Sequence, residues 1–510
     1  MGARGVEGTY HRRPVIQPDD IAAMMPVMLG SGVNLYGTYM FQGGENLNGK
    51  LTTLQESQAT GYPSNLPVKS YDFEAPLSEF GDEREVLRKL KVFNYFLNDF
   101  GGDLAPMPPF QPAKLPAEPQ DFSVGRVSVR TNGESGFLFF NNYVRGYSMP
   151  ARPAFQVVVK LLAREVPIPE KPINLPSGAY GIWPFGLNMG SLHLRYATAE
   201  LFTHTIDNAG ETYYFVVTSG VAPQFVFEER DVIESRGHQE LREGATFVNG
   251  LEPSLDAAIT AKHGNGQTTR IVLLSQHQAE NAWKLEAEDK HLLLTEDQFF
   301  EIGNTVTLGT DRTSKFNFTV IPAISATPSA DIALQQRNGS FASTFSAEFP
   351  AATPAVTIKE VQKAEEVPPV KPGPPQTWRP KGVAMAPAEE EFASAAKWEI
   401  AIPDSDWKGV DDLFLQMEYD GDIARLTSGG HLLDDNFYDG QAWRVGLKRF
   451  RSEIAKGGLE LEILPRRADA PIFLEKQYRN SQFTNGQIDE LRSVQVIPQY
   501  EIAIHFNETK

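Results

Sequence analysis

The sequence predicts a multidomain, mainly β protein that begins with a short helical region. Most of the chain alternates apolar and polar residues with a period of two, the pattern of strands with one buried face. Proline-rich stretches at residues 105–120 and 350–394 divide it, because proline favours stiff, extended connectors. A length of 510 residues, 41% of them hydrophobic, leaves room for about three or four packed domains.

The first region carries helix and strand signals in turn. Pro18 begins a predicted helix that Gly30 ends, and Pro26 is expected to kink it. Residues 33–41 (VNLYGTYMF) form a short apolar run between glycines, which predicts a buried strand. The loop that follows reaches Gly81, and loops of that size in compact domains are usually functional.

A second helix is predicted from Asp82 to Gly101. Asp82 is a favourable N-cap residue, and the pair Gly101 and Gly102 is expected to end the helix. Three- and four-residue spacing predicts one apolar face packed against a sheet. That face consists of Val86, Leu90, Phe93 and Leu97.

Two antiparallel β regions are predicted next, at residues 121–230 and 231–349. In the first, Thr131 to Gly133 forms a hairpin turn between alternating strands. Trp183 is expected in the core between two sheets, with a carbohydrate groove as the alternative. Further strands are predicted at 155–162, 192–196, 201–205, 213–218, 270–274 and 316–320.

The last region, residues 395–510, is predicted to be a β-sandwich or jelly roll. Leu413, Leu415 and Met417 alternate with residues of the other face, and Asp420–Gly421 is predicted to be a hairpin turn. The preceding linker is expected to be extended and mobile, or pinned along a neighbouring domain, because its composition buries little apolar surface.

Charge and composition exclude several functions. A net charge of −18 argues against nucleic-acid binding, which needs a basic face. No apolar run approaches the roughly 20 residues of a membrane span, and the absence of cysteine excludes disulfides and thiolate metal sites. His263, His277 and His291 lack ligand spacing, so they are expected to be ordinary surface or loop residues. No metal and no cofactor is predicted.

Three short sequence motifs, here called words, resemble motifs of the glycoside hydrolase family 35 β-galactosidases. They are residues 9–14 (TYHRRP), 37–46 (GTYMFQGGEN) and 70–81 (SYDFEAPLSEFG). The family's usual versions of the last two are Y-M-F/Y-H-G-G-T-N and S-Y-D-Y-D-A-P-L-x-E-x-G. The chain departs at Gln42, where His is usual, and at Glu45, where Thr is usual. Both departures lie in the loop that would face a sugar.

Later words resemble the domains that follow the barrel in this family, and together they imply a fold. The resemblance implies that residues 1–104 are the remnant of a (β/α)8 TIM barrel, carrying its last strands and helices. It also implies that residues 395–510 are a galactose-binding-like jelly roll. The words are residues 135–143 (SGFLFFNNY), 180–185 (YGIWPF), 419–426 (YDGDIARL), 434–440 (DDNFYDG) and 443–450 (WRVGLKRF).

The resemblance implies retaining hydrolysis of terminal β-galactosides in carbohydrate metabolism, in the periplasm or outside the cell. That reaction uses an acid/base and a nucleophilic carboxyl about 5 Å apart. A full barrel takes about 200–250 residues, and the family's nucleophile would fall at or before Met1. The chain is therefore expected to lack the catalytic pair and to be inactive alone. Its one Asn-Glu pair, Asn507–Glu508, is expected to be a solvated tail.

The predicted sugar-binding residues all lie in or beside the long loop. Tyr39, Tyr71 and Phe73 would offer apolar faces to a sugar ring, and Gln42 and Asn46 would bond to its hydroxyl groups. The alternative is that the aromatic residues belong to the core of the barrel. The expected ligand is a β-galactoside or a plant-type glycan.

Two other functions stay open. One is a non-catalytic carbohydrate-binding or scaffolding protein derived from the family, and the other is an active hydrolase with a rebuilt pair, Glu7 and Glu45. A partial barrel leaves strand edges and apolar faces uncovered. Self-association, or binding of a separate N-terminal barrel polypeptide, is therefore expected. No signal peptide opens the chain.

Overall fold

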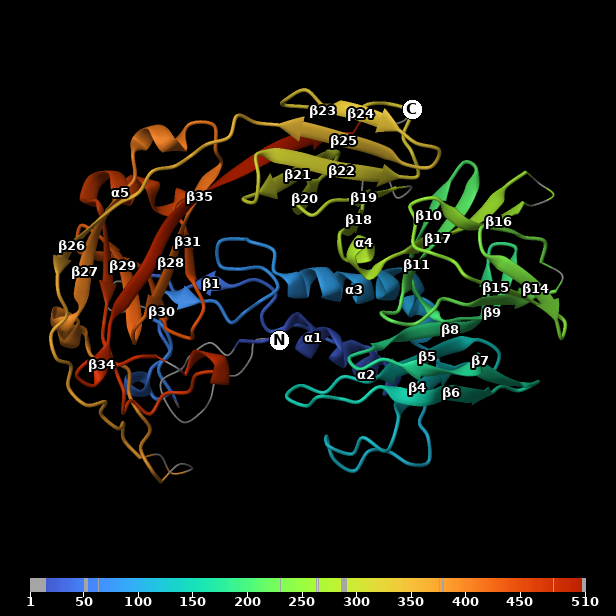
Figure 1. Cartoon of the computed structure of the whole chain (residues 1–510), viewed down its shortest axis with the longest axis horizontal. Helices are drawn as coiled ribbons and strands as arrows, with labels where there is room; N and C mark the ends of the chain where they lie inside the picture. Colours follow the sequence, from blue (N-terminus) through green and yellow to red (C-terminus); the bar gives the residue numbers. More distant parts are fainter. Residues whose placement is uncertain are drawn as a thin grey trace.

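The computed structural model describes residues 15–49, 54–62, 64–229, 231–262, 264, 266–285, 291–375, 377, 380–479 and 481–506. It is mainly β, with 44% strand and 13% helix. The prediction of a mainly β chain with several antiparallel sheets is therefore confirmed. In Figure 1 three groups of strands surround a centre that holds the N-terminal helices.

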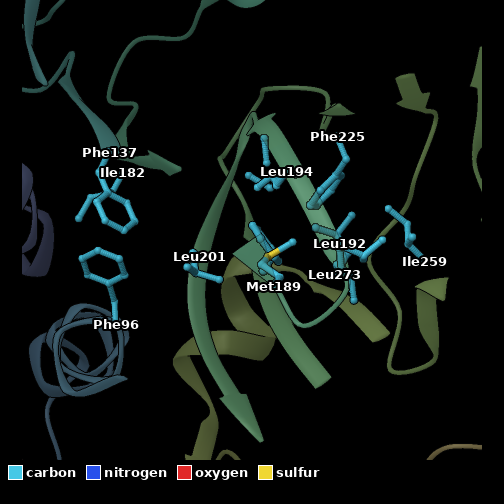
Figure 2. Close-up of a cluster of buried hydrophobic side chains, with 14 of the residues drawn as sticks. Phe96, Phe137, Ile182, Met189, Leu192, Leu194, Leu201, Phe225, Ile259 and Leu273 are labelled. Atoms are coloured by element: carbon cyan, nitrogen blue, oxygen red, sulfur yellow. The ribbon is translucent and has the colours of Figure 1, made fainter. Parts of the chain in front are cut away.

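Three helices carry the N-terminal part of the chain: α1 (Pro18–Ala22), α2 (Met24–Gly30) and α3 (Glu85–Leu104). The apolar face of α3 packs on an eight-stranded sheet, here called the large sheet. There the ring centroids of Phe96 and Phe137 are 5.1 Å apart, with an interplanar angle of 83°. Figure 2 shows Phe96 facing Phe137 and Ile182. Such edge-to-face pairs stabilise a core by about 0.5–1.5 kcal/mol beyond their burial.

Residues 109–274 form an eight-stranded sheet, in the order β14-β15-β12-β9-β8-β5-β4-β3, a five-stranded sheet, in the order β10-β11-β17-β16-β13, and the two-stranded sheet β6-β7. The predicted turn at residues 131–133 joins β4 to β5, as expected. Bounds are β3 (Pro109–Phe110), β4 (Arg126–Thr131), β5 (Gly136–Asn141), β6 (Arg152–Lys160), β7 (Glu165–Leu175), β8 (Tyr180–Met189), β9 (Leu192–Ala197), β10 (Ala199–Asp207), β11 (Gly210–Val217), β12 (Phe225–Glu228), β13 (Glu234–Ser235), β14 (His238–Arg242), β15 (Ala245–Asn249), β16 (Ala257–Lys262) and β17 (Thr268–Leu274).

Trp183 on β8 lies in a core, which confirms the first of its two predicted roles. Its side chain is fully buried, and its ring centroid is 4.5 Å from that of Phe140. The indole N–H donates to Thr218 Oγ1 at 2.9 Å, so its polar atom is satisfied. Trp183 is therefore not a groove residue.

A further sheet, in the order β18-β19-β22-β25-β24, follows the short helix α4 (Gln276–Glu280). It packs against β21 and the second half of β35, so residues from both ends of this part share one core. Bounds are β18 (Ala282–Lys284), β19 (Leu292–Leu294), β20 (Gln298–Ile302), β21 (Thr305–Thr310), β22 (Lys315–Ile321), β23 (Ser329–Ala330), β24 (Gln335–Asn338), β25 (Ser343–Glu348) and β35 (Glu490–His505).

The C-terminal part packs one sheet, β26-β27-β32-β29-β30, against strands β35, β28 and β31. β35 pairs with β28 through residues 490–499 and with β21 through residues 500–505, so it belongs to two cores. The other bounds are β26 (Thr357–Gln362), β27 (Ala396–Ala401), β28 (Asp412–Asp420), β29 (Ile423–Ser428), β30 (His431–Phe437), β31 (Trp443–Gly446), α5 (Arg451–Gly457), β32 (Leu459–Ile463), β33 (Arg466–Arg467) and β34 (Gln487–Ile488).

The hairpin predicted at Asp420–Gly421 is wrong. β28 ends at Asp420, but it pairs with β31 and β35, whereas β29 pairs with β30 and β32. The turn therefore carries the chain from one sheet to the other. Local turn chemistry gives the position of the reversal but not which strand will be the partner.

The strand predicted at residues 33–41 is also wrong, since none is assigned there. A strand needs a hydrogen-bonding neighbour, and residues 34–40 make no backbone hydrogen bond to another described residue. The two-residue strands β1 (Gly44–Glu45) and β2 (Ser70–Tyr71) pair with each other beyond it.

Three helix details differ from the predictions. The break near Pro26 lies at Ala23, because Pro26 falls in the first turn of α2, where proline is tolerated. Arg84 rather than Asp82 occupies the N-cap position of α3, and the Asp82 carboxylate instead accepts from the Gln298 amide at 3.0 Å. The helix also runs through Gly101 and Gly102 to Leu104, because tertiary packing outweighs the low helix propensity of glycine.

The stretch predicted as a linker is partly structured. Residues 357–362 form β26, which pairs with β27. Farther along, the Gln58 amide donates to the carbonyl of Ala384 at 3.1 Å, and the Ala386 N–H donates to Asn65 at 3.3 Å. The segment is thus pinned along the surface of its neighbours, the second of the two predicted arrangements.

Candidate functional site

Tyr39 and Tyr71, here called the tyrosine pair, come together at the surface of the long loop. Their hydroxyl oxygens are 3.1 Å apart, and Tyr71 donates to Glu56 Oε1 at 2.9 Å. The Phe73 ring lies edge-on to that of Tyr71, with centroids 4.8 Å apart at 79°. Tyr39 is 68% exposed, so its ring is open to a ligand. The structure thus brings together the three predicted aromatic residues.

The two predicted amides differ in their surroundings. Asn46 is buried, its side chain donates to the Val68 carbonyl at 3.1 Å, and its backbone N–H donates to the Lys69 carbonyl at 2.8 Å. Gln42 has an exposed side chain, and its backbone forms a bridge with Leu77. Asn46 therefore holds the loop together, while Gln42 leaves its amide accessible.

The Glu45 carboxylate sits between two cations. Lys69 Nζ lies 2.6 Å away and an Arg449 guanidinium nitrogen lies 3.0 Å away. Glu7, its predicted catalytic partner, lies outside the described residues, as do the word at residues 9–14 and the pair Asn507–Glu508. The described residues therefore give no distance for the Glu7–Glu45 pair.

A cavity of about 400 Å³ lies where three segments that are distant in the sequence meet. Residues 70–81 form one wall, and residues 434–440 and 443–450 of the C-terminal part supply another. Lining side chains include Ser70, Asp72, Ser78, Asn436, Asp439 and Trp443. Sequence words that lie far apart along the chain are therefore neighbours at one junction.

Ion pairs lie within and between the walls of this junction cavity. Arg84 forms a two-pronged pair with Asp72, at 3.0 and 2.8 Å. Arg444 reaches Asp311 at 2.6 Å and Asp82 at 3.4 Å. Burial raises the pKa of Asp82, and the nearby Arg444 opposes that rise. The acidic groups of the cavity are thus largely engaged in the structure itself.

Asp435 on β30 fastens the C-terminal part to the loop. Its carboxylate accepts three backbone hydrogen bonds, from Val68 at 2.6 Å, Lys69 at 2.7 Å and Ser70 at 3.2 Å. Hydrogen bonds from N–H groups to a carboxylate are stronger than bonds between neutral groups. Asp435 therefore fixes the backbone directly before Tyr71.

The neighbouring Asp434 is an unusual carboxyl. It is 1% exposed, and its Oδ2 has no hydrogen-bond partner among the described atoms. Burial raises its pKa well above the ordinary value, and the charges of Glu79, Asp435 and Glu45 raise it further. A buried carboxyl facing other carboxylates holds a proton to higher pH.

Glu200 on β10 is a second enclosed carboxyl, beside a small cavity of about 150 Å³. It receives two long hydrogen bonds, from Ile182 N and Thr218 Oγ1, both at 3.4 Å. A Cβ on Gly181 would lie 2.6 Å from its carboxyl carbon, so glycine makes the space that it occupies. Desolvation raises the pKa of Glu200 to about 8.

Sequence reasoning did not single out Glu56, Asp434, Asp435 or Glu200. The word at residues 434–440 contained the two aspartates, but the word alone did not say that the pair faces the loop. Glu56 and Glu200 stand in no recognisable word. Only the folded chain brings Glu56 to Tyr71, Asp435 to the backbone of residues 68–70, and Glu200 to Gly181.

The histidines bear out the expectation of ordinary surface and loop positions as far as the structure describes them. His277 is exposed and lies 3.4 Å from Glu296, and His291 contacts the Pro322 carbonyl at 2.9 Å. His263 lies outside the described residues. Within the described ranges, no three His, Asp or Glu side chains are grouped so that they could hold a metal ion.

Family models and curated proteins supply no relative for this chain. No protein-family model matches it, and no curated protein matches it. In the part of the chain that the structure describes, no helix combines the length and the apolar character needed to cross a bilayer.

Proposed function

We propose that this chain is the C-terminal part of a retaining β-galactosidase of glycoside hydrolase family 35, inactive alone. The long loop contributes the tyrosine pair to the galactoside site. The two catalytic carboxyls come from the earlier strands of the barrel, as in the family that the sequence motifs resemble, and a separate N-terminal barrel polypeptide is one way to supply them. Residues 1–104 are then the end of a TIM barrel, and residues 395–510 are a galactose-binding-like jelly roll.

The observation that carries the proposal is the exposure of the apolar side chains in and beside residues 34–40. Leu35 is 90% exposed, Tyr39 68% and Phe41 48%, whereas Tyr36 and Met40 on the alternate side are half-buried. Both faces of the segment are therefore apolar, although only one is covered. Strands with two apolar faces are typical of parallel sheets that are covered on both sides, as in TIM barrels.

The unpaired backbone points the same way. Residues 34–40 have no backbone hydrogen bond to another described residue, and exposed N–H and C=O groups in an extended segment are a template for an added strand. A barrel polypeptide would supply strands at its edges and a layer over Leu35 and Phe41. This accounts for a strand-like sequence that forms no strand here.

The convergence of family-like words at the junction cavity also supports the assignment. Asp435, in one word, holds the backbone of residues 68–70, at the start of another. Arg449, in a third, donates to the Glu79 carbonyl at 2.6 Å. Such coupling gives these words a shared structural reason to occur together in one chain.

A second candidate is a carbohydrate-binding protein without catalysis. The observation that favours it is that the tyrosine pair is assembled within this chain alone, with Tyr39 exposed. It predicts saturable binding of galactosides whether or not a barrel polypeptide is present.

The decisive experiment measures hydrolysis of an aryl β-galactoside and binding of methyl β-galactoside by the purified chain. The proposal expects binding without turnover, with methyl α-galactoside as the control ligand. Turnover abolished by Glu45→Gln or Glu7→Gln would show a rebuilt catalytic pair and would contradict inactivity. Absence of binding would remove the tyrosine pair from the galactoside site.

The two candidates separate when a family 35 barrel domain is added to the purified chain. Restored hydrolysis, lost with the double substitution Leu35→Asp and Phe41→Asp, supports the split enzyme. Binding with no association to the barrel domain favours the non-catalytic protein.

A further inference from the structure

Glu56 lies beside the tyrosine pair, on the Tyr71 side. Its Oε1 accepts from the Tyr71 hydroxyl at 2.9 Å, and that hydroxyl is 3.1 Å from the hydroxyl of Tyr39. Glu56, Tyr71 and Tyr39 thus form a chain of three polar groups. Only its outer member, Tyr39, is widely exposed.

The chain has one direction when Glu56 is ionised. A carboxylate has no proton to give, so Tyr71 must donate to it. The single proton of Tyr71 is then used, and its oxygen can interact with Tyr39 only as an acceptor. Tyr39 therefore donates its hydroxyl proton to the Tyr71 oxygen. Its oxygen therefore presents lone pairs, and no proton, to the solvent side.

From this geometry we infer that Glu56 is a positioning residue that makes Tyr39 a hydrogen-bond acceptor for a hydroxyl group of a bound sugar. The inference rests on the proposed function and adds the ligand chemistry of the same site. Neutral sugar hydroxyls can donate to such an oxygen, whereas the ionised carboxylate of a uronic acid or the dianionic phosphate of a sugar phosphate cannot.

Two features of Tyr71 agree with this role. Phe73 holds its ring edge-on, which limits the positions that its hydroxyl can take. Burial raises the pKa of Tyr71, and the hydrogen bonds to Tyr39 and Glu56 and the charge of Glu56 add to the rise. The Tyr71 proton is thus held against loss and stays available to Glu56.

The first test needs no ligand. The full chain is labelled with 13C at tyrosine Cζ, and the two resonances are assigned with Tyr39→Phe and Tyr71→Phe. Acidification through the range in which carboxylates protonate should shift both resonances in the wild type. Glu56→Gln should abolish both shifts, and Tyr71→Phe should abolish the shift of Tyr39. Glu85→Gln, which removes an exposed carboxylate that pairs with Lys89, should change neither.

Either of two results overturns the inference. One is a Tyr39 resonance that still titrates in Glu56→Gln, and the other is a Tyr39 resonance that still titrates in Tyr71→Phe. A purely structural role of Glu56 would not transmit its protonation to Tyr39 through Tyr71. The readout therefore separates positioning from general support of the loop.

The second test measures binding of methyl β-galactoside by ligand-observed NMR. Tyr39→Phe and Glu56→Leu should weaken it about three- to tenfold, the worth of one hydrogen bond, because leucine offers Tyr71 no acceptor. Glu85→Gln should not. Equal affinity in wild type and Glu56→Leu overturns the acceptor role while the proposed function stands. A wild type that binds no galactoside contradicts the proposed function. The ligand-free resonance shifts then test only whether Glu56, Tyr71 and Tyr39 form the inferred chain of hydrogen bonds.

Discussion

The Asp435 carboxylate accepts a hydrogen bond from the backbone N–H of Lys69 at 2.7 Å, across 366 residues of sequence. With its bonds from Val68 and Ser70, it makes one side chain the meeting point of two distant parts of the chain. The loop that carries the tyrosine pair is thus held from outside as well as by its own contacts.

Asp435→Asn should lower the free energy of unfolding by about 2–3 kcal/mol. An amide replaces one acceptor oxygen with an N–H group, which leaves a buried backbone donor without a partner. Urea unfolding measures the change, and limited proteolysis should find new cleavage within residues 54–84. Asp404→Asn, at a side chain that is 93% exposed, is the matched control. Equal stability of the two variants would contradict the role of Asp435.

Glu200→Gln should make stability less sensitive to pH between about 4.5 and 8. The pKa of Glu200 is raised from 4.5 to about 8 in the folded protein, so the folded state binds the proton more tightly than the unfolded state. Wild-type stability contributed by this proton is full in acid and declines as pH rises to about 8. The variant should gain on the wild type by on the order of 3–5 kcal/mol across that window.

The measurement is urea unfolding of both proteins at a series of pH values. Glu252→Gln, at an exposed position, should follow the wild-type curve. Parallel curves for wild type and Glu200→Gln would show that Glu200 titrates normally.

The purified chain should self-associate through exposed apolar side chains of its N-terminal region. Leu35 and Leu47 in this region are 90% and 75% exposed, and extensive exposed apolar surface favours association. Leu35→Ser with Leu47→Ser should shift sedimentation toward the monomer. Val232→Ser, at an 86% exposed apolar residue elsewhere, should not. A monomeric wild type at tens of micromolar would refute the prediction.

Phe96→Ala should cost about 3–5 kcal/mol of unfolding free energy. Phe96 is 2% exposed and fills the space between α3 and the large sheet, against Phe137. Phe110→Ala, which removes a ring that is 55% exposed, should cost much less. Thermal and urea unfolding compare the two. Similar losses would mean that the contact of α3 with the sheet adds little to stability.

Local pattern predicted much of the fold. The alternation at Leu413, Leu415 and Met417 gave β28, and the 131–133 turn gave the hairpin of β4 and β5, because both signals are contained in a few neighbouring residues. The prediction of a hairpin at Asp420–Gly421 was wrong because the strands on either side of this turn pair in two different sheets. The strand at residues 33–41 failed because its pattern requires neighbours that the described residues do not supply.

The candidate site divides in the same way. The aromatic residues Tyr39, Tyr71 and Phe73 were predicted as sugar-binding residues from the sequence of the long loop. The structure brings them together. Glu56 and Asp435 act through contacts across a loop and across the whole chain. No window of sequence contains both partners of such a contact, so only the fold could reveal them.

The shared strand β35 sets an order of events during synthesis. Its residues 500–505 pair with β21 at residues 305–310. The pairing of β21 with β35 can therefore form only after the ribosome has made the C-terminal strand. At about 5–20 residues per second, the delay is on the order of ten seconds or more. During that interval the edge of β21 stays open to chaperones and to other nascent chains.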